Sequence, residues 1–165
     1  MDGIGYRTIR AEDRATVLEL HCEINYASDT SWARELPYEA YRDKWMSTSQ
    51  PGQFFESLLR SMDDPRTMAE LAETEDGRTV GYLWVQFVDV PDYALTIAEI
   101  CDIAVAREYR GRGFGLDLLR RIEDRAKRNG AGLLRSETGA ENAASRSLHA
   151  KFGFETYRIG FEKRL

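Results

Sequence analysis

The chain has 165 residues, of which 42% are hydrophobic and 31% charged, and its formal net charge is −5. These values favour one globular domain over residues 1–165 with enough apolar residues for a core. We expect a cytoplasmic protein, because no apolar stretch is long enough to span a bilayer and the first five residues lack the pattern of a secretion signal. Two scattered cysteines and two histidines are too few to predict a disulfide framework or a metal site.

Positive charge is concentrated between residues 106 and 130. This segment holds eight basic and four acidic residues, a net charge of +4, which leaves −9 for the rest of a chain with net charge −5. A local cationic patch favours a small polyanionic ligand, because nucleic acids usually bind to an extended basic face. A solvated helix surface is the alternative interpretation. We expect neither a nucleic-acid nor a membrane partner.

The N-terminal half predicts one strand and then three helices. Residues 6–10 alternate as in a strand, and Asp13 begins a stretch with apolar residues on one helical face. Two more helical patterns cover residues 38–45 and 54–62, with a loop expected over residues 47–52 between them.

From residue 67 the hydrophobic period shortens to two. Residues 67–74, 79–90 and 95–105 predict three strands of a meander, and the first two are joined by a turn that contains Asp-Gly. Residues 120–128 belong to an amphipathic helix that ends at Asn129-Gly130. The apolar side of this helix consists of Leu118, Leu119, Ile122 and Ala126.

The C-terminal part predicts a strand, a helix and further strands. Residues 133–137 read as a short strand, Asn142 caps a helix that reaches Phe152, and residues 154–165 supply the closing strands. The fold class is therefore α/β (α+β), with a mixed, largely antiparallel sheet flanked by helices.

The segment Tyr-Arg-Gly-Arg-Gly-Phe-Gly at residues 109–115, here called the glycine loop, connects a strand to a helix. A helix N-terminus offers free backbone N–H groups, and glycines let an anion approach them. Arg110 and Arg112 can add charge-assisted hydrogen bonds. We therefore predict a phosphate site, with a plain tight turn as the alternative. The glycine spacing fits neither the dinucleotide fingerprint nor the P-loop.

At this loop the sequence resembles the GNAT superfamily of acetyl-CoA-dependent N-acyltransferases. The superfamily motif Arg/Gln-x-x-Gly-x-Gly/Ala after a strand ending in valine is matched by residues 110–115 after Val105. A second motif, Asn-x-x-Ser/Ala-x-x-Leu-Tyr-x-Lys-x-Gly-Phe, is matched by residues 142–154, with His149 at the tyrosine position. Both motifs lie in the C-terminal half, and the N-terminal half agrees only in its pattern of elements.

The resemblance implies a sheet splayed open to bind acetyl-CoA as cosubstrate. It implies that the pyrophosphate lies on the backbone N–H groups of Arg110, Gly111, Arg112, Gly113, Phe114 and Gly115. It implies that the pantetheine arm adds like a strand to Ile103, Ala104 and Val105, with further contacts from Asn142 and Ser145. Asn142 also has an ordinary role as a helix cap.

A protonated amine must lose a proton before it can attack a thioester. Glu99 is the first candidate for the base, because it resembles the strand glutamate that serves this purpose in the histone-acetylating branch. By strict alternation, Glu99, Cys101, Ile103 and Val105 share one face of the strand. Asp102 is the rival and is expected to point the other way. A solvent-facing or ion-paired carboxylate is the alternative for Glu99.

The departing thiolate of CoA needs a proton or a hydrogen bond. His149 is the candidate acid, because an imidazole can exchange a proton near neutral pH. Tyr157 is the alternative donor, and a helix-surface histidine without a catalytic role is the other interpretation of His149. A backbone N–H of the strand near Val105 is expected to polarise the thioester oxygen.

The acceptor is expected to be a small-molecule amine, and the acidic remainder of the chain suggests that it is cationic. Aromatic residues in the N-terminal region could line a pocket for it, with Glu35 and Glu39 nearby, or could simply pack on the sheet. These residues are Trp32, Tyr38, Tyr41 and Trp45. A protein lysine or N-terminal amine is the alternative acceptor, and a non-catalytic acyl-CoA sensor is the alternative function. The oligomeric state is left open, a homodimer included.

Overall fold

A five-stranded sheet forms the centre of the structure, a computed structural model that describes residues 3–28 and 33–165. Its strands lie in chain order: β1 (Ile4–Thr8), β2 (Met68–Thr74), β3 (Thr79–Val90), β4 (Leu95–Val105) and β5 (Leu133–Ser136). Neighbours from β1 to β4 are antiparallel, and β5 is parallel to β4. The predicted fold class, a mixed and largely antiparallel sheet, is confirmed.

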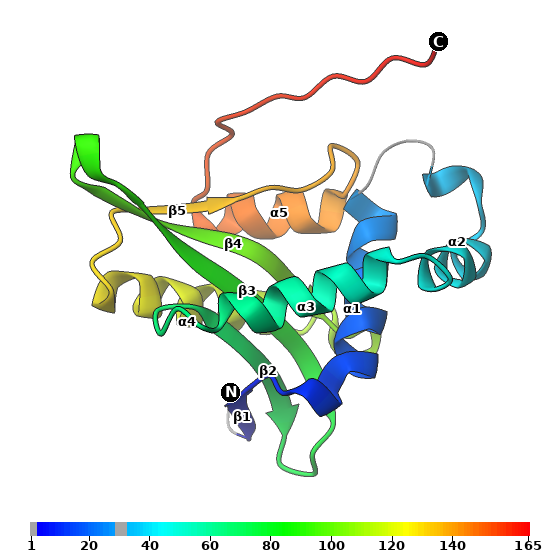
Figure 1. Cartoon of the computed structure of the whole chain (residues 1–165), viewed down its shortest axis with the longest axis horizontal. Coiled ribbons are helices and arrows are strands. Elements are labelled where there is room, and N and C mark those ends of the chain that lie inside the picture. The colour runs from blue at the N-terminus through cyan, green and yellow to red at the C-terminus, as the bar shows by residue number, and fades with distance from the viewer. Residues whose placement is uncertain (1–2, 29–32) are drawn as a thin grey trace.

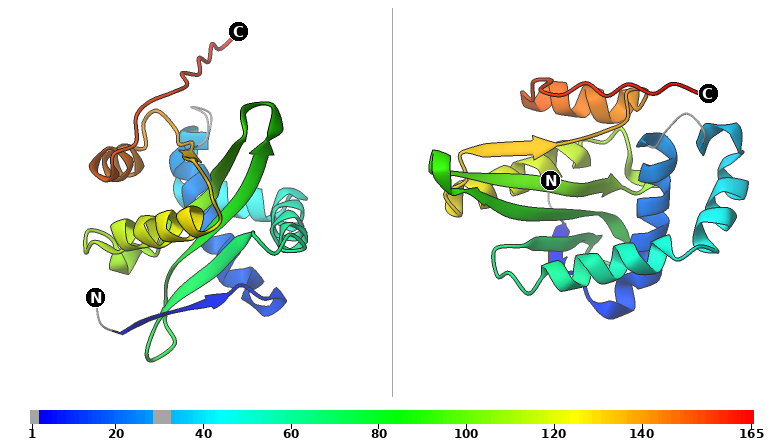
Figure 2. Two further views of the ribbon diagram at one scale, coloured as in Figure 1. Left: turned by 90° about the vertical axis from the view of Figure 1, so that its left-hand side faces the viewer. Right: turned by 45° about the horizontal axis from the view of Figure 1, so that its top comes forward.

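Helices cover both faces of this sheet (Figures 1 and 2). Helices α1 (Arg14–Ser28) and α3 (Gln50–Ser61) lie on one face, with α2 (Tyr38–Met46) beside them. Helix α4 (Phe114–Arg128) lies on the other face, next to α5 (Ala143–Phe152). The four residues predicted for the apolar side of α4 are all buried, so this stripe attaches the helix to the sheet.

The connection between α2 and α3 is shorter than the loop predicted over residues 47–52. Helix α3 already begins at Gln50, with Pro51 in its first turn. Proline suits this position, because its fixed φ is helical and its missing N–H would have no partner there. Ser47 and Thr48 bond back to carbonyls at the end of α2, so the two helices are joined by a tight turn.

The C-terminal residues do not form the closing strands predicted over residues 154–165. After α5 the chain leaves the body of the molecule and runs along its outside (Figure 1). From residue 155 onward its side chains are exposed, as the exposed fractions of Ile159 (72%) and Phe161 (95%) show. A strand needs a neighbour for its N–H and C=O groups, and this segment pairs with no strand in the described part of the chain.

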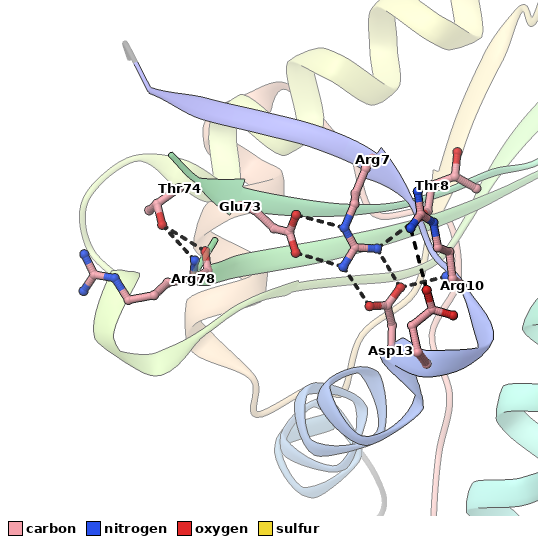
Figure 3. Close-up of polar contacts among 8 residues, drawn as sticks. Arg7, Thr8, Arg10, Asp13, Glu73, Thr74 and Arg78 are labelled. Carbon is pink, nitrogen blue, oxygen red and sulfur yellow. Dashed lines mark hydrogen bonds and ion pairs between the residues drawn. The ribbon is translucent and has the colours of Figure 1, made fainter. Parts of the chain in front are cut away.

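The start of the chain is attached to the sheet by the side chain of Arg7 (Figure 3). Its guanidinium donates to Glu73 of β2 at 2.9 Å and to both oxygens of Asp13 at 2.7 Å. Asp13 also accepts the backbone N–H of Arg10 at 2.7 Å. The hydrogen bonds from Arg7 hold the pKa of Asp13 below its usual value. These contacts join β1 and β2 to the turn that precedes α1.

Strand β4 extends beyond its pairing with β5. The last pair in the parallel ladder joins Ile100 to Ser136, whereas β4 continues to Val105. Among the described residues, the edge of β4 from Cys101 to Val105 therefore has no neighbouring strand. We call this opening the β4–β5 cleft. It agrees with the expected splay of the sheet.

Candidate functional site

A cavity of about 110 Å³ lies at the closed end of the β4–β5 cleft. Its lining comes from the end of α1, from β4, from β5 and the loop after it, and from α5. The residues are Ile24, Ser28, Ile100, Cys101, Asp102, Ile103, Ser136, Glu137, Thr138, Asn142, Ser145 and His149. Segments far apart in the sequence thus bring two carboxylates, an imidazole and several hydroxyl groups to one small space.

A bulge in β4 determines which side chains share a face of the sheet. The register pairs Asp102 with Trp84 and Glu99 with Gln86, and it leaves Cys101 as an extra residue. Because Trp84 and Gln86 are two residues apart on β3, their partners lie on one face. The expectation that Asp102 points away from Glu99 is therefore wrong, since strict alternation does not hold across a bulge.

Asp102 is a buried carboxylate at the centre of a polar cluster. Its side chain is 4% exposed, and its Oδ2 lies 2.5 Å from Nδ1 of His21 on α1. The hydroxyl of Tyr82 donates to the same oxygen. Burial and the charge of Asp102 raise the pKa of Tyr82 well above its usual value, which keeps this phenol a donor. The Oδ1 atom has no hydrogen-bond partner among the described residues.

The ring of His21 is held by aromatic neighbours on the α1–α3 side of the sheet. It stacks on Phe54 with ring centroids 3.4 Å apart and an interplanar angle of 13°, and it lies 5.7 Å from the ring of Trp45. A carboxylate only accepts hydrogen bonds, so Nδ1 of His21 is the donor in its contact with the Asp102 carboxylate. The cluster therefore fixes the orientation of Asp102 from two directions.

Glu99 lies outside the cavity lining. Its side chain is 36% exposed, and its carboxylate is 3.8 Å from Arg135 on β5. Ile103 pairs with Leu83, so it lies on the opposite face from Glu99 and not on the expected common face. The structure thus gives Glu99 the surroundings of a partly exposed, loosely ion-paired residue.

His149 lines the cavity, and each of its two ring nitrogens has a hydrogen-bond partner. Its Nδ1 is 2.8 Å from the carbonyl oxygen of Ser145, and its Nε2 is 2.9 Å from Oγ of Ser136. A carbonyl only accepts, so Nδ1 carries a proton. In the neutral ring, Nε2 must then accept the hydroxyl proton of Ser136. Tyr157, the alternative donor, is 51% exposed, donates to Glu137 and does not line the cavity.

The glycine loop presents backbone N–H groups at the start of α4. Gly111 and Gly113 have φ angles of +72° and +92°, a conformation that residues with a Cβ rarely adopt. In the described part of the chain, the N–H groups of residues 111–115 donate to no backbone carbonyl. These five amides at a helix N-terminus thus have no backbone partner and could bind an anion.

The two arginines of the glycine loop have different surroundings. Nε of Arg110 donates to the carbonyl of Val105 at 2.8 Å, and its Nη2 donates to Glu23 of α1. Arg110 therefore joins the loop to β4 and α1. The guanidinium carbon of Arg112 lies 5.6 Å from the ring centroid of Tyr109 and 5.7 Å from that of Phe114, where its charge stays at the surface.

Asn142 combines a cap with a place in the cavity wall. Its Oδ1 accepts the backbone N–H of Ser145 at 3.1 Å, which confirms the predicted helix cap. Its Nδ2 donates to Oγ of Ser28 at 3.0 Å. A Cβ on Gly139 would lie 2.3 Å from the carbonyl oxygen of Ser28. The loop after β5 is therefore packed tightly against the end of α1.

The aromatic acceptor pocket expected in the N-terminal region does not form in the described residues. Tyr41 and Trp45 are 3% and 5% exposed and belong to the core, which is the alternative interpretation of that pattern. Tyr38 packs edge-on to Tyr26. Of the other residues predicted there, Glu35 pairs with Arg164 and Glu39 is exposed, whereas Trp32 lies outside the described residues.

Sequence reasoning did not identify His21, Tyr82 or Ser136 as site residues. The sequence places His21 on the apolar face of a helix, but its partner Asp102 is 81 residues away in the sequence. Ser136 ends a short strand whose parallel neighbour cannot be identified from local pattern. Only the folded sheet brings these residues together.

Residues 30–154 match the sequence model of a family described as the acetyltransferase (GNAT) family. The chain belongs to this family. An uncharacterised N-acetyltransferase of Methanocaldococcus jannaschii is 27% identical over 134 residues, which cover 76% of this chain and 56% of that relative's length. An uncharacterised N-acetyltransferase of Bacillus subtilis is 26% identical over 112 residues, which cover 68% of this chain and 70% of the relative.

Solved structures share the GNAT fold over nearly the whole chain. A putative acetyl transferase from Pyrococcus furiosus superimposes with a TM-score of 0.68 at 25% identity, covering 98% of this chain and 100% of that one. A glucosamine-6-phosphate N-acetyltransferase from Arabidopsis thaliana gives a TM-score of 0.63 at 17% identity, covering 99% of each chain. The second likeness is evidence for the fold alone.

Residues 3–28 and 33–165 contain neither a candidate metal cluster nor a membrane-spanning helix. No cluster of three or more His, Cys, Asp and Glu side chains in these ranges is arranged to hold a metal ion. No helix within them has the length and apolar composition needed to cross a bilayer.

Proposed function

We propose that this protein transfers the acetyl group of acetyl-CoA directly to the primary amine of a small cationic molecule. The observation that carries the proposal is the presence of three features in one structure. These are the unpaired amides of residues 111–115, the open edge of β4, and the cavity at the closed end of the β4–β5 cleft.

The residues present fit acetyl-CoA in charge and shape. The amides of the glycine loop suit a pyrophosphate, because they combine unused donors with the positive end of the α4 dipole. The edge of β4 at Ile103, Ala104 and Val105 suits the amide-containing pantetheine arm as an added strand. Asn142 and Ser145 line the cavity where the arm would end.

Asp102 is the better supported base for the amine. A lysine-like amine, with a pKa of about 10.4, is almost wholly protonated near neutral pH and must lose a proton to react. Oδ2 of Asp102 is occupied by His21 and Tyr82, whereas Oδ1 is left to accept that proton. Glu99 stays a candidate from the sequence, but its position outside the cavity lining favours Asp102.

His149 is the proposed acid for the departing thiolate. Its Nδ1 proton is held by the carbonyl of Ser145, so only Nε2 faces the cavity side of the ring. His149 must therefore be doubly protonated to donate directly from Nε2. A backbone N–H on the unpaired edge of β4 would polarise the thioester oxygen.

The cavity lining also supports a cationic acceptor. Asp102 and Glu137 are its two carboxylates, and no arginine or lysine lines it among the described residues. A positively charged amine would be attracted to this end of the cleft before it loses its proton.

A turnover assay tests this proposal. The measured quantity is CoA thiol released from acetyl-CoA in the presence of polyamines, aminoglycosides, amino acids and lysine peptides. We expect release that depends on a small cationic amine and yields its N-acetyl product. Thiol release only with peptides or proteins would show that the acceptor is a protein amine and not a small molecule. Binding of acetyl-CoA without turnover on any acceptor would favour a sensor.

A further inference from the structure

Ser136 has no role in the proposed direct transfer of acetyl to an amine, yet its hydroxyl forms a pair with the imidazole of His149. Oγ of Ser136 lies 2.9 Å from Nε2 of His149, and Nδ1 of His149 lies 2.8 Å from the carbonyl oxygen of Ser145. A hydroxyl, a base and a group that orients the base are the three parts of an activated serine. Here a backbone carbonyl occupies the orienting position.

The tautomer of neutral His149 allows the ring to act as a base toward the hydroxyl of Ser136. Because Nδ1 donates to the carbonyl of Ser145, neutral His149 has its lone pair on Nε2. The hydroxyl of Ser136 is the group that points a proton at this lone pair. The same ring can therefore remove the serine proton without any rearrangement.

The pair lies where the thioester of the cosubstrate would be held. Ser136 is the last residue of β5 and pairs with Ile100, directly before the β4–β5 cleft opens. Both Ser136 and His149 line the cavity at the end of the cleft. The unpaired edge of β4 supplies backbone N–H groups for a developing oxyanion.

The thiol in the cavity wall is held inactive. Cys101 lines the same space, but burial raises the pKa of its thiol to about 12, so at neutral pH it is not a thiolate. Its Sγ donates to Oε1 of Gln86 at 3.3 Å.

We propose that Ser136 accepts the acetyl group when no amine is bound, so that the protein also hydrolyses acetyl-CoA through an acetyl-serine ester. This inference rests on the proposed binding of acetyl-CoA in the cleft. Oγ of Ser136 forms a bond to the carbonyl carbon, and the carbon–sulfur bond breaks. Nε2 of His149 takes the hydroxyl proton and gives it to the sulfur, which leaves as CoA thiol.

Water completes the second half of the reaction. His149 Nε2 takes a proton from a water molecule that attacks the ester carbonyl, and it returns this proton to Oγ of Ser136 as the carbon–oxygen bond breaks. Acetate is released, and Ser136 and His149 regain their starting protonation. The net reaction consumes one acetyl-CoA and one water and yields CoA, acetate and a proton.

The test uses the full chain with acetyl-CoA and no amine. Thiol release is followed continuously, and acid-quenched samples are analysed by intact mass and peptide mass spectrometry. We expect slow thiol release and an adduct with the mass of one acetyl group on the peptide that contains Ser136. Hydroxylamine should remove the adduct, because it cleaves an ester but leaves an acetyl-lysine amide intact.

Two variants separate the proposed step from background reactions. Ser136→Ala should abolish the adduct and lower amine-independent thiol release by about a hundredfold. Ser147→Ala, the same substitution at an exposed serine of α5 that does not line the cavity, should retain both. A shift of melting temperature on adding acetyl-CoA shows that each variant is folded and binds the cosubstrate.

The outcomes distinguish this inference from the proposed function. Wild-type protein that binds acetyl-CoA and acetylates an amine, but shows neither adduct nor amine-independent release, would overturn the Ser136 step alone. An adduct on another residue, or release unchanged in Ser136→Ala, would overturn it equally. Failure to bind acetyl-CoA at all would contradict both proposals.

Discussion

The carboxylate of Asp102 and the imidazole of His21 lie 2.5 Å apart and join β4 to α1 beneath the cavity. The contact orders a carboxylate that is only 4% exposed, and a third group, the hydroxyl of Tyr82, donates to the same oxygen. A buried charge is stable only when such donors surround it. The cluster thus places two donors on Oδ2 of this buried carboxylate and leaves Oδ1 for chemistry.

Replacing Asp102 by Asn should remove the base and keep the shape of the side chain. We expect kcat/KM for amine acetylation to fall by about a hundredfold or more, with binding of acetyl-CoA retained. Glu99→Gln is the matched control and should change the rate little, because Glu99 is partly exposed outside the cavity. The reverse ranking of the two variants in steady-state kinetics would return Glu99 to the role of base.

Tyr82→Phe tests how much the hydrogen bond from Tyr82 to Asp102 contributes to stability. The side chain of Tyr82 is fully buried, and the variant leaves Asp102 with one donor fewer without opening a large cavity. We expect a loss of about 1–3 kcal/mol in the free energy of unfolding, measured with urea. Tyr93→Phe, at a residue 80% exposed, should be neutral. Equal stability of the two variants would show that the hydrogen bond to Asp102 contributes nothing.

The bounds of β3 and β4 could be predicted from the sequence, but the faces of β4 could not. Period-two alternation, the Asp-Gly turn and the glycine loop define β3, β4 and the start of α4, and the structure places β3 and β4 at the predicted bounds. The extra residue Cys101 leaves no local signal, because a bulge depends on how the neighbouring strand pairs.

Parts of the site that depend on a local motif could be predicted, whereas parts that depend on contacts between distant segments could not. The unpaired amides of the glycine loop and the cap at Asn142 follow from helix chemistry that acts within a few residues. The partners of His149 and Asp102 come from other elements, so His21 and Ser136 appear only in the folded chain. Residues 154–165 show the opposite case, in which a clear alternation finds no partner strand in the described part of the chain.

Asp13→Asn should reveal a pH-dependent part of the stability. Hydrogen bonds from Arg7 lower the pKa of Asp13 in the folded state, so its contribution is complete above the unfolded value of about 3.9 and is lost as pH falls through the folded value. At pH 7 the variant should be about 1.5–3 kcal/mol less stable than wild type. This difference should shrink on acidification below about pH 4.

Urea unfolding from pH 7 to pH 3 measures this effect. Asp92→Asn serves as the control, because Asp92 is exposed in a short turn between β3 and β4. A difference between wild type and Asp13→Asn that stays constant over the whole pH range would contradict the role assigned to the Arg7 hydrogen bonds.

Gly139→Ala tests whether the loop after β5 shapes the cavity. The added Cβ would lie 2.3 Å from the carbonyl oxygen of Ser28 and 2.7 Å from its Cα, so the loop must move away from α1. We expect a lower melting temperature and weaker binding of acetyl-CoA. Gly160→Ala places a Cβ in open space and should change neither. Unchanged cosubstrate affinity in a destabilised Gly139→Ala protein would show that this loop does not shape the cosubstrate site.

Hydrogen exchange with and without acetyl-CoA, read by mass spectrometry, tests the central claim most directly. The β4–β5 cleft and the glycine loop should gain protection together, in peptides that cover residues 101–105 and 111–115, because their amides acquire acceptors on the cosubstrate. Protection confined to other segments, or none at saturating acetyl-CoA, would contradict the account.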